Sequence, residues 1–202
     1  NKNDLRVIKT KKTIHKALLL LLKKKSLPQI KITELCKEAT INRGTFYFHY
    51  EEVGDVFSEF FEEIIQDLKA SYDEPYKVLG KDNFSVHRLD PNMVRIFHHI
   101  KKYEGFYKIV FSNNVSSNYY YMLFDEIRAN LTSDENNHHQ IITNKFFYSY
   151  QANAIIGMII EWYRNGFQES AEEMNVYLME IVKFKVLDEK LKKEWSFENA
   201  SK

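Results

Sequence analysis

The sequence predicts an all-α protein, and three observations favour this fold class. Only 3 Pro and 6 Gly occur in 202 residues, although both are hard to avoid in the turns of all-β proteins. Apolar residues recur at the i, i+3, i+4 and i+7 positions of amphipathic helices. No strand-like alternation of useful length occurs. The length fits one or two domains, and we expect a boundary between 1–52 and 53–202.

The first helix is expected over 5–25, because Ile14, Ala17, Leu18 and Leu21 share one face. The three lysines at 23–25 end it, where positive charge favours the helix dipole. A short second helix over 32–39 follows the loop around Pro28, and its apolar residues repeat the same spacing at Ile32, Leu35, Cys36 and Ala39.

A third short helix is expected over 43–49, since Asn42 is a favourable N-cap. A longer fourth helix runs over 53–72 and carries a dense apolar face. The stretch Asp73-Glu74-Pro75, with the region of Gly80, is expected to end that helix and to connect the two parts of the chain.

The C-terminal part predicts five more helices. Asp90-Pro91 is typical of a helix start, with Asp as the cap and Pro at the first position. Asn165-Gly166 predicts a C-terminal stop, and Ser170 with Glu173 predicts a capping box. The five helices are expected over about 91–102, 104–112, 116–131, 138–165 and 171–188, with a polar loop over 132–137.

Charge is distributed unevenly along the chain. Residues 1–50 hold 12 Lys and Arg against 3 Asp and Glu, a net charge of +9. Residues 51–202 hold the other 17 basic and 25 acidic groups, a net charge of −8. A basic N-terminal module suggests contact with a polyanion. Charge alone leaves open a solvated lysine-rich helix or an anionic membrane surface.

Two short helices joined by a tight turn within the basic segment predict a helix-turn-helix. Small residues at Cys36 and Ala39 allow the second helix to cross closely, and Phe46 and Tyr50 anchor that helix from below. Arg can reach guanine edges, Thr can contact phosphate or a thymine methyl, and Tyr can donate to phosphate. The expected DNA-binding residues are Thr33, Asn42, Arg43, Gly44, Thr45, Tyr47 and His49.

The stretch from Ile32 to Tyr50, and above all its Gly-Thr-Phe-Tyr-x-His-Tyr run, resembles the recognition-helix pattern of the TetR family of bacterial regulators. A weaker resemblance over 148–175 is to the C-terminal domain of a TetR subgroup that includes regulators of dihydroxyacetone kinase operons. The resemblance implies an all-helical homodimer whose last two long helices form a four-helix interface. It also implies an effector pocket in the C-terminal domain.

The residues themselves favour the same assembly. The 138–165 helix carries more large apolar residues than one monomer face needs, and Gly157 lies beside them. The predicted interface consists of Phe146, Tyr150, Ala154, Gly157, Met158, Trp162, Tyr177 and Ile181. Aromatic residues that can line an effector cavity, or simply form core, are Phe106, Tyr107, Tyr120 and Phe147.

The sequence departs from the family pattern in two places. Thr40 stands where the family usually has a turn Gly, and Val53 stands where it usually has a phosphate-contacting Lys, preceded by Glu51 and Glu52. Loss of one cation beside two anions is expected to weaken contact with the DNA backbone. These residues support a second hypothesis, a dimeric adaptor that binds a protein or ligand with weak or no DNA binding.

Other classes of function find little support. The pairs His98-His99 and His138-His139 point in different helical directions, and Glu135-x-x-His138 is only half of a di-iron motif. No Gly-rich phosphate loop or nucleophile motif occurs. We therefore expect no enzyme activity, metal or cofactor. The longest apolar run, 17–22, is too short to span a bilayer, and a single Cys forms no intrachain disulfide. We expect a cytoplasmic regulator, most simply a repressor of a palindromic operator.

Overall fold

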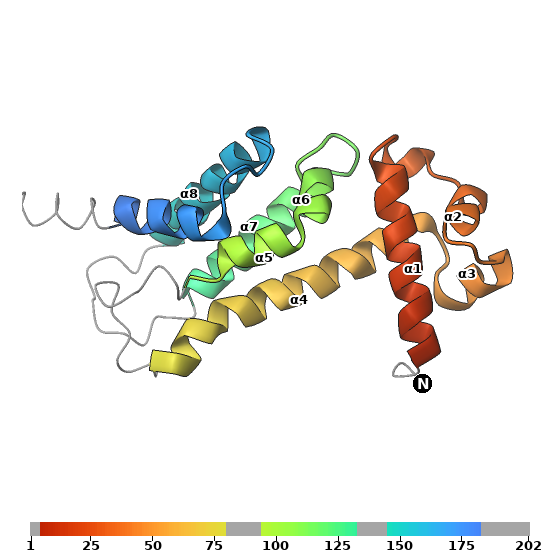
Figure 1. Ribbon diagram of the computed structural model, residues 1–202, viewed down its shortest axis with the longest axis horizontal. Coiled ribbons are helices and arrows are strands. Elements are labelled where there is room, and N and C mark those ends of the chain that lie inside the picture. The colour runs from red at the N-terminus through yellow and green to blue at the C-terminus, as the bar shows by residue number, and fades with distance from the viewer. Residues whose placement is uncertain (1–4, 80–93, 133–144, 183–202) are drawn as a thin grey trace, which may run out of the picture. The chain divides into compact units, whose positions relative to one another are not determined.

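The structure is a computed structural model that describes residues 5–79, 94–132 and 145–182. Every regular element within these residues is a helix, so the all-α prediction is confirmed (Figure 1). The elements are α1 (Leu5–Leu22), the 3₁₀ turn η1 (Leu27–Gln29), α2 (Ile32–Glu38), α3 (Arg43–His49), α4 (Val53–Leu79), α5 (Ile96–Lys102), α6 (Glu104–Val110), α7 (Asn118–Thr132), α8 (Lys145–Arg164) and a last helix over 171–182.

The chain forms two compact units. The first comprises residues 1–70 and 103–133, and the second comprises residues 71–102 and 134–202. Helix α4 contributes to both units, because the division falls within it. The predicted domain boundary between residues 52 and 53 stays a prediction.

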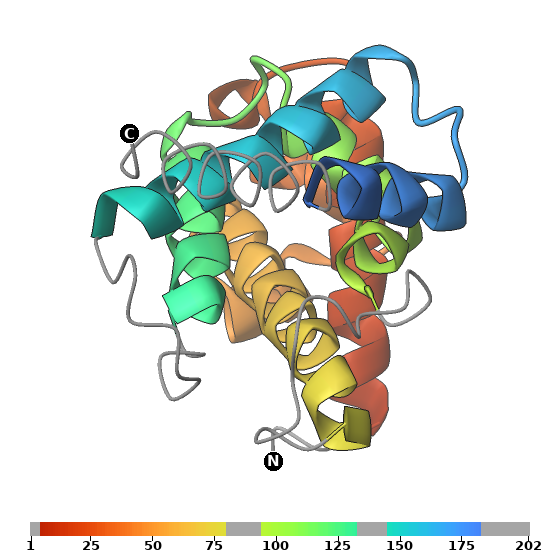
Figure 2. The same cartoon turned by 90° about the vertical axis from the view of Figure 1, so that its left-hand side faces the viewer.

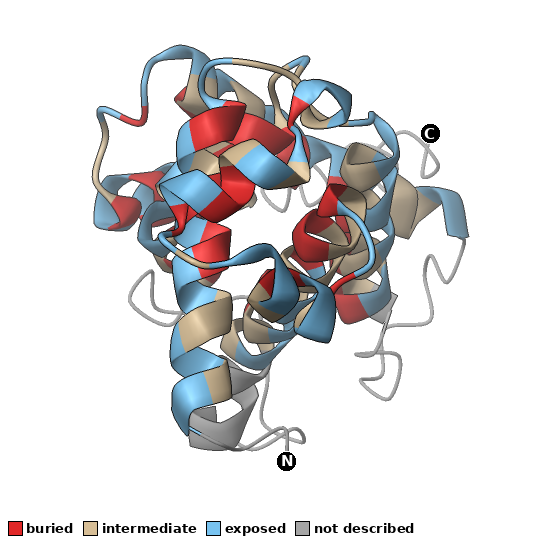
Figure 3. Cartoon of the chain, turned by 90° about the vertical axis from the view of Figure 1, so that its right-hand side faces the viewer, coloured by how far each residue is buried: buried red, intermediate tan, exposed pale blue. Residues whose placement is uncertain are grey.

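The first unit is built around α1 and the start of α4. Helix α1 packs on α2 and α6, and α2 packs on α3. Figure 3 shows buried residues on one side of these helices and exposed residues on the other. Phe106 packs between Phe57 and Phe61 at ring-centroid distances of 5.6 and 5.9 Å. This aromatic core fixes the helices that carry the basic segment.

The second unit is centred on Trp162 of α8. Its ring packs edge-on against Phe97 and Phe167, and its indole N–H donates to the Glu169 carbonyl at 3.1 Å. The chain turns back between α8 and the last described helix (Figure 2). The predicted stop at Gly166 is confirmed by its positive φ of 72° and by the end of α8 at Arg164.

The predicted capping box is also confirmed. The backbone N–H of Ser170 donates to the Glu173 carboxylate at 2.7 Å, and the Glu173 N–H donates to the Ser170 hydroxyl at 3.1 Å. Two backbone donors at the start of the last helix are therefore satisfied by side chains of that helix.

Two helix ends differ from their predicted positions. Helix α1 ends at Leu22, three residues before the predicted end, and the Asn114 side chain donates to the Leu22 carbonyl at 2.8 Å, which satisfies an acceptor that the helix end leaves open. Helix α4 runs past Pro75 to Leu79, so the predicted stop was wrong. A proline removes one backbone donor, and this helix continues across it.

The predicted helix start at Asp90-Pro91 is tested only in part, because the described residues resume at 94. Helix α5 begins at Ile96, after two non-helical residues, so a continuous helix from Asp90-Pro91 is wrong. The Asp90-Pro91 start itself lies outside the described residues, as do the loop and helix start over 133–144 and the tail after 182.

The turn between α2 and α3 places Thr40 in an unfavourable backbone conformation. The Thr40 N–H donates to the Lys37 carbonyl at 3.2 Å, and the Ile41 N–H donates to the Cys36 carbonyl at 3.0 Å. These two bonds form a Schellman motif, whose central residue is usually Gly. Thr40 adopts φ = 55°, which is strained for a β-branched residue.

Thr40→Gly is expected to stabilise the protein by about 1 kcal/mol. Relief of the left-handed strain, about 1–2 kcal/mol, exceeds the added entropy of a glycine in the unfolded chain. The Thr40 side chain is exposed, so no packing is lost. Urea unfolding measures the gain, with Thr40→Ala as the control that keeps a Cβ atom. An equal gain in Thr40→Ala contradicts the backbone explanation.

Candidate nucleic-acid interface

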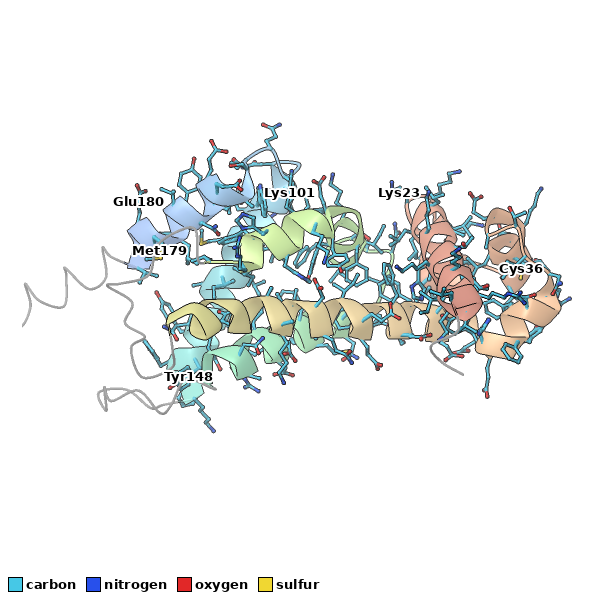
Figure 4. The ribbon with its side chains drawn as sticks, turned by 60° about the horizontal axis from the view of Figure 1, so that its bottom comes forward. Lys23, Cys36, Lys101, Tyr148, Met179 and Glu180 are labelled. Atoms are coloured by element: carbon cyan, nitrogen blue, oxygen red, sulfur yellow. The ribbon has the colours of Figure 1, made fainter. Side chains whose placement is uncertain are left out.

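The α2–turn–α3 segment is a helix-turn-helix held by a small apolar core. Leu35 and Cys36 of α2, Ala39 at the end of that helix and Phe46 of α3 are all at most 4 % exposed. Cys36, labelled in Figure 4, is therefore part of this core, and burial raises the pKa of its thiol. The expected inward-facing residues are confirmed in this role.

Asn42 caps the start of α3. Its side-chain oxygen accepts hydrogen bonds from the Thr45 backbone N–H at 2.7 Å and from the Thr45 hydroxyl at 3.0 Å. A Cβ atom at position 44 would lie 3.3 Å from the same oxygen, so glycine is the residue that leaves this cap undisturbed. Two of the predicted DNA-binding residues, Asn42 and Thr45, thus also fix the start of the helix.

Arg43 and Tyr47 form an exposed pair on one side of α3. An Arg43 Nη atom donates to the Tyr47 hydroxyl at 3.2 Å, and the guanidinium carbon lies 5.7 Å from the centre of the Tyr47 ring. Both side chains are exposed. The pair offers several hydrogen-bond donors to a ligand with acceptor groups.

Helical geometry identifies an outward residue that the sequence reasoning missed. Phe46 is fully buried and marks the inward direction of α3. With about 100° of rotation per residue, positions 44 and 48 point almost directly away from Phe46. Gly44 has no side chain, and Phe48 is 79 % exposed. Of the remaining predicted residues, Thr33 is exposed and His49 is half-buried.

A polar network lies behind α3 and joins α1, the end of α3 and α4. Lys11 forms an ion pair with Glu59, and the Tyr50 hydroxyl hydrogen-bonds to Glu59. His15 Nε2 lies 3.3 Å from the same hydroxyl, and its ring stacks on Phe60 at 4.5 Å. The network therefore fixes the last residue of the recognition segment to two longer helices.

Burial sets the charge state of His15. Burial lowers its pKa to about 4, Glu59 partly opposes this change, and Lys11 lowers the pKa further. The Glu63 carboxylate lies 3.8 Å from His15 Nδ1, and its own pKa is raised by burial and by Glu59. The imidazole is thus neutral in the folded protein at pH 7.

This pKa predicts acid lability of the first unit. In the unfolded chain His15 has its ordinary pKa of 6.5, while burial in the folded protein lowers this pKa to about 4. Stability is therefore complete above about pH 6.5 and falls by roughly 3 kcal/mol as the pH drops toward 4. Urea unfolding at pH values from about 7.5 down to about 4 covers that window and measures the loss. His15→Gln, which does not titrate, should show a flatter profile; identical profiles contradict the assignment to His15.

The start of α4 departs from a simple phosphate-binding site. Val53 is 8 % exposed, so its side chain belongs to the core of the first unit. The Asp55 carboxylate accepts hydrogen bonds from the backbone N–H groups of Glu51 and Glu52, at 3.1 and 2.9 Å. These backbone donors are satisfied within the chain, beside the exposed Glu51 and Glu52 side chains.

The predicted interface residues divide into exposed and buried sets. Trp162 is 1 % exposed and forms the centre of the second unit, so its expected place on an interface is corrected to the core. Met158 is half-buried. The others are exposed on α8 and on the last helix: Phe146, Tyr150, Ala154, Gly157, Tyr177 and Ile181.

The predicted effector residues are divided between the two units. Phe106 and Tyr107 are buried in the aromatic core of the first unit, and burial raises the pKa of Tyr107. Tyr120 is half-buried in that unit, and Phe147 belongs to the second unit. An open hollow of about 400 Å³ in the second unit has a different lining: His98, Lys101, Lys102, Ser170, Ala171 and Glu172.

The described residues contain no cluster of three or more His, Cys, Asp or Glu side chains placed to hold a metal ion. Within the same ranges, no helix is long and apolar enough to cross a membrane. Glu135 and His138, considered above as half of a di-iron motif, lie outside these ranges.

Comparisons with known proteins agree with the helix-turn-helix. Residues 88–184 match the TetR-type family described as transcriptional regulator C-terminal region. Curated protein sequences give no match. Three solved structures cover 88–89 % of this chain, and this chain covers 95–98 % of theirs.

The three structures are regulators of similar architecture. The dihydroxyacetone kinase operon activator DhaS is 22 % identical with a TM-score of 0.59. A TetR transcriptional regulator from Streptococcus agalactiae 2603V is 17 % identical with a TM-score of 0.60. A TetR-family regulator from Syntrophomonas wolfei str. Goettingen is 14 % identical with a TM-score of 0.68. At these identities the structures share the fold.

Proposed function

We propose that the chain is a transcriptional regulator of the TetR family and binds a palindromic DNA operator as a homodimer, which the match over residues 88–184 and the shared fold support. The single observation that carries this proposal is the exposed face of α3, where Arg43, Tyr47 and Phe48 project from a segment with a net charge of +9. Positive charge attracts the DNA backbone, and side chains of such a helix can reach base edges in the major groove. Binding to DNA implies action in the cytoplasm.

The homodimer is supported by the apolar residues exposed on the second unit. Phe146 and Tyr150 of α8 are 70 % and 53 % exposed, and Tyr177 and Ile181 of the last helix are 46 % and 47 % exposed. Residues 146, 150, 154 and 157 share one helical face, as do 177 and 181. Two such helices from each chain can form a four-helix bundle around a two-fold axis. The axis would present two recognition helices to successive major grooves.

We place the protein as a repressor whose DNA binding is relieved by a small-molecule effector. We propose that the residues that contact this effector include Phe106, Tyr107, Tyr120 and Phe147. DhaS is named an operon activator, so a promoter–reporter measurement must be able to detect either a rise or a fall in reporter output. Rising reporter output on deletion of the protein indicates repression, and falling output indicates activation.

A gel-shift experiment on the DNA that flanks the protein's own gene tests the proposed function. We expect a discrete complex that survives excess random DNA and disappears with excess of the same unlabelled fragment. Sedimentation at micromolar concentration is expected to give a dimer. A monomer, or a shift abolished equally by both competitors, contradicts specific operator binding by a homodimer.

The second candidate is a dimeric adaptor with weak or no DNA binding. It is favoured by one observation at the start of α4, where Glu51 and Glu52 precede a buried Val53. The backbone N–H groups of both Glu residues already donate to the Asp55 carboxylate, so they are not open to a phosphate. Under this hypothesis the gel-shift finds no specific complex although sedimentation still finds a dimer.

A further inference from the structure

Phe48 is the most exposed large hydrophobic side chain among the described residues, at 79 %. It lies two positions after the buried Phe46, so it projects from the side of α3 opposite the core. Gly44, one turn earlier on the same outward side, carries no side chain. Phe48 is therefore the side chain that extends farthest along the outward direction of the recognition helix.

The surroundings of Phe48 indicate what covers it. The His49 ring meets the Phe48 ring edge-on, at 4.9 Å between centroids and 84° between planes. Arg43 and Tyr47 lie on the adjacent exposed side of α3. The segment around this aromatic ring has a net charge of +9 over residues 1–50. An exposed apolar ring on a basic segment complements a ligand that is anionic overall and offers apolar groups locally.

Duplex DNA has this character in its major groove. Its phosphates line the edges, and the 5-methyl group of thymine is the apolar group that the groove presents to a side chain. We propose that Phe48 contacts thymine methyl groups in each half-site and so determines part of the operator sequence. This inference rests on the proposed operator binding and adds to it a base preference that hydrogen-bonding residues do not supply.

The absence of a side chain at position 44 supports the reach of Phe48. A larger residue there would stand on the same outward side, one turn away, and would hold the helix off the base edges. A Cβ at position 44 would also press on the Asn42 cap. The bare surface at Gly44 thus leaves Phe48 free to approach the base edges of the groove.

The test removes methyl groups from DNA without changing base pairing. The full-length protein first selects binding sites from a pool of duplexes with a randomised centre. Each thymine of the selected site is then replaced by deoxyuridine, which lacks only the 5-methyl group. For the wild type we expect about 3- to 10-fold weaker binding at one or two thymines in each half-site.

The Phe48→Ala variant gives the decisive comparison. It should bind the thymine site more weakly than the wild type does, and it should bind the thymine and deoxyuridine sites equally. Phe48→Leu, which keeps an apolar group, should retain part of the methyl dependence. Leu5→Ala is the matched control, because Leu5 is 71 % exposed in the same unit but lies outside α2 and α3; it should leave the thymine-to-deoxyuridine ratio unchanged.

Each failure has a distinct meaning. If sites are selected but the methyl dependence persists in Phe48→Ala, or is absent in the wild type, the inference is wrong and operator binding stands. If no site is selected, the proposed function and the inference fail together. If Phe48→Ala changes sedimentation but not DNA binding, Phe48 is a protein contact and the inference is wrong.

Discussion

Gly157→Leu is expected to convert the proposed dimer to a monomer at micromolar concentration and to abolish the proposed operator binding. Gly157 is exposed on α8, on the same face as Phe146, Tyr150 and Ala154. In the single chain, a Cβ at this position meets no atom within 4 Å. The position is exposed and has room for a Cβ in the single chain, and a leucine improves helix propensity by about 1 kcal/mol. The added side chain can interfere only with a partner that packs closely on this face.

The measurement is sedimentation, with circular dichroism to establish that the helix content is kept. The matched control is Gly105→Leu, since Gly105 is also an exposed helical glycine with nothing within 4 Å of its Cβ position. It lies on α6 in the first unit, outside the proposed interface. If Gly157→Leu still sediments as a tight dimer, Gly157 does not lie in the interface. If Gly157→Leu and Gly105→Leu weaken dimerisation equally, the effect is a general cost of an exposed leucine.

Arg43→Ala is expected to weaken binding to the specific operator by about 1–3 kcal/mol while leaving binding to random DNA nearly unchanged. The Arg43 guanidinium is exposed and held over the Tyr47 ring by a hydrogen bond of 3.2 Å to the hydroxyl. This arrangement presents the planar group at one side of α3 before DNA arrives. A guanidinium can donate two parallel hydrogen bonds to guanine.

Titrations on both DNAs measure the difference, at one fixed salt concentration because phosphate contacts are salt-dependent. Arg43→Lys is the control, since it keeps the charge but loses the planar pair of donors. It should match the wild type on random DNA and resemble Arg43→Ala on the operator. Losses of equal size on both DNAs would show that Arg43 contacts only phosphate.

Local sequence signals predicted several helix starts and ends closely. Asn42 as an N-cap, Ser170 with Glu173 as a capping box and Gly166 as a stop all depend on neighbours within a few residues. Such signals are present in the sequence itself. The position of Thr40 in the turn was likewise evident, although its φ of 55° required the structure.

Predictions that depend on distant contacts were less accurate. The Leu22 carbonyl at the early end of helix α1 accepts a hydrogen bond from Asn114, which is 92 positions away. Trp162 has the spacing of the interface residues, but contacts with Phe97 and Phe167 place it in the core. Phe48 was overlooked because an aromatic residue between Tyr47 and His49 reads as core until the inward direction of the short helix is fixed by Phe46.

The reactivity of the buried Cys36 thiol reports how often the α2–turn–α3 segment opens. Cys36 is the only cysteine in the chain, and it is 4 % exposed with a raised pKa. A thiol reagent therefore modifies it only during transient separation of α2 from its neighbours, so the rate of modification counts those openings. A ligand that holds the segment closed slows this reaction in proportion to its occupancy, without any label attached to the protein beforehand.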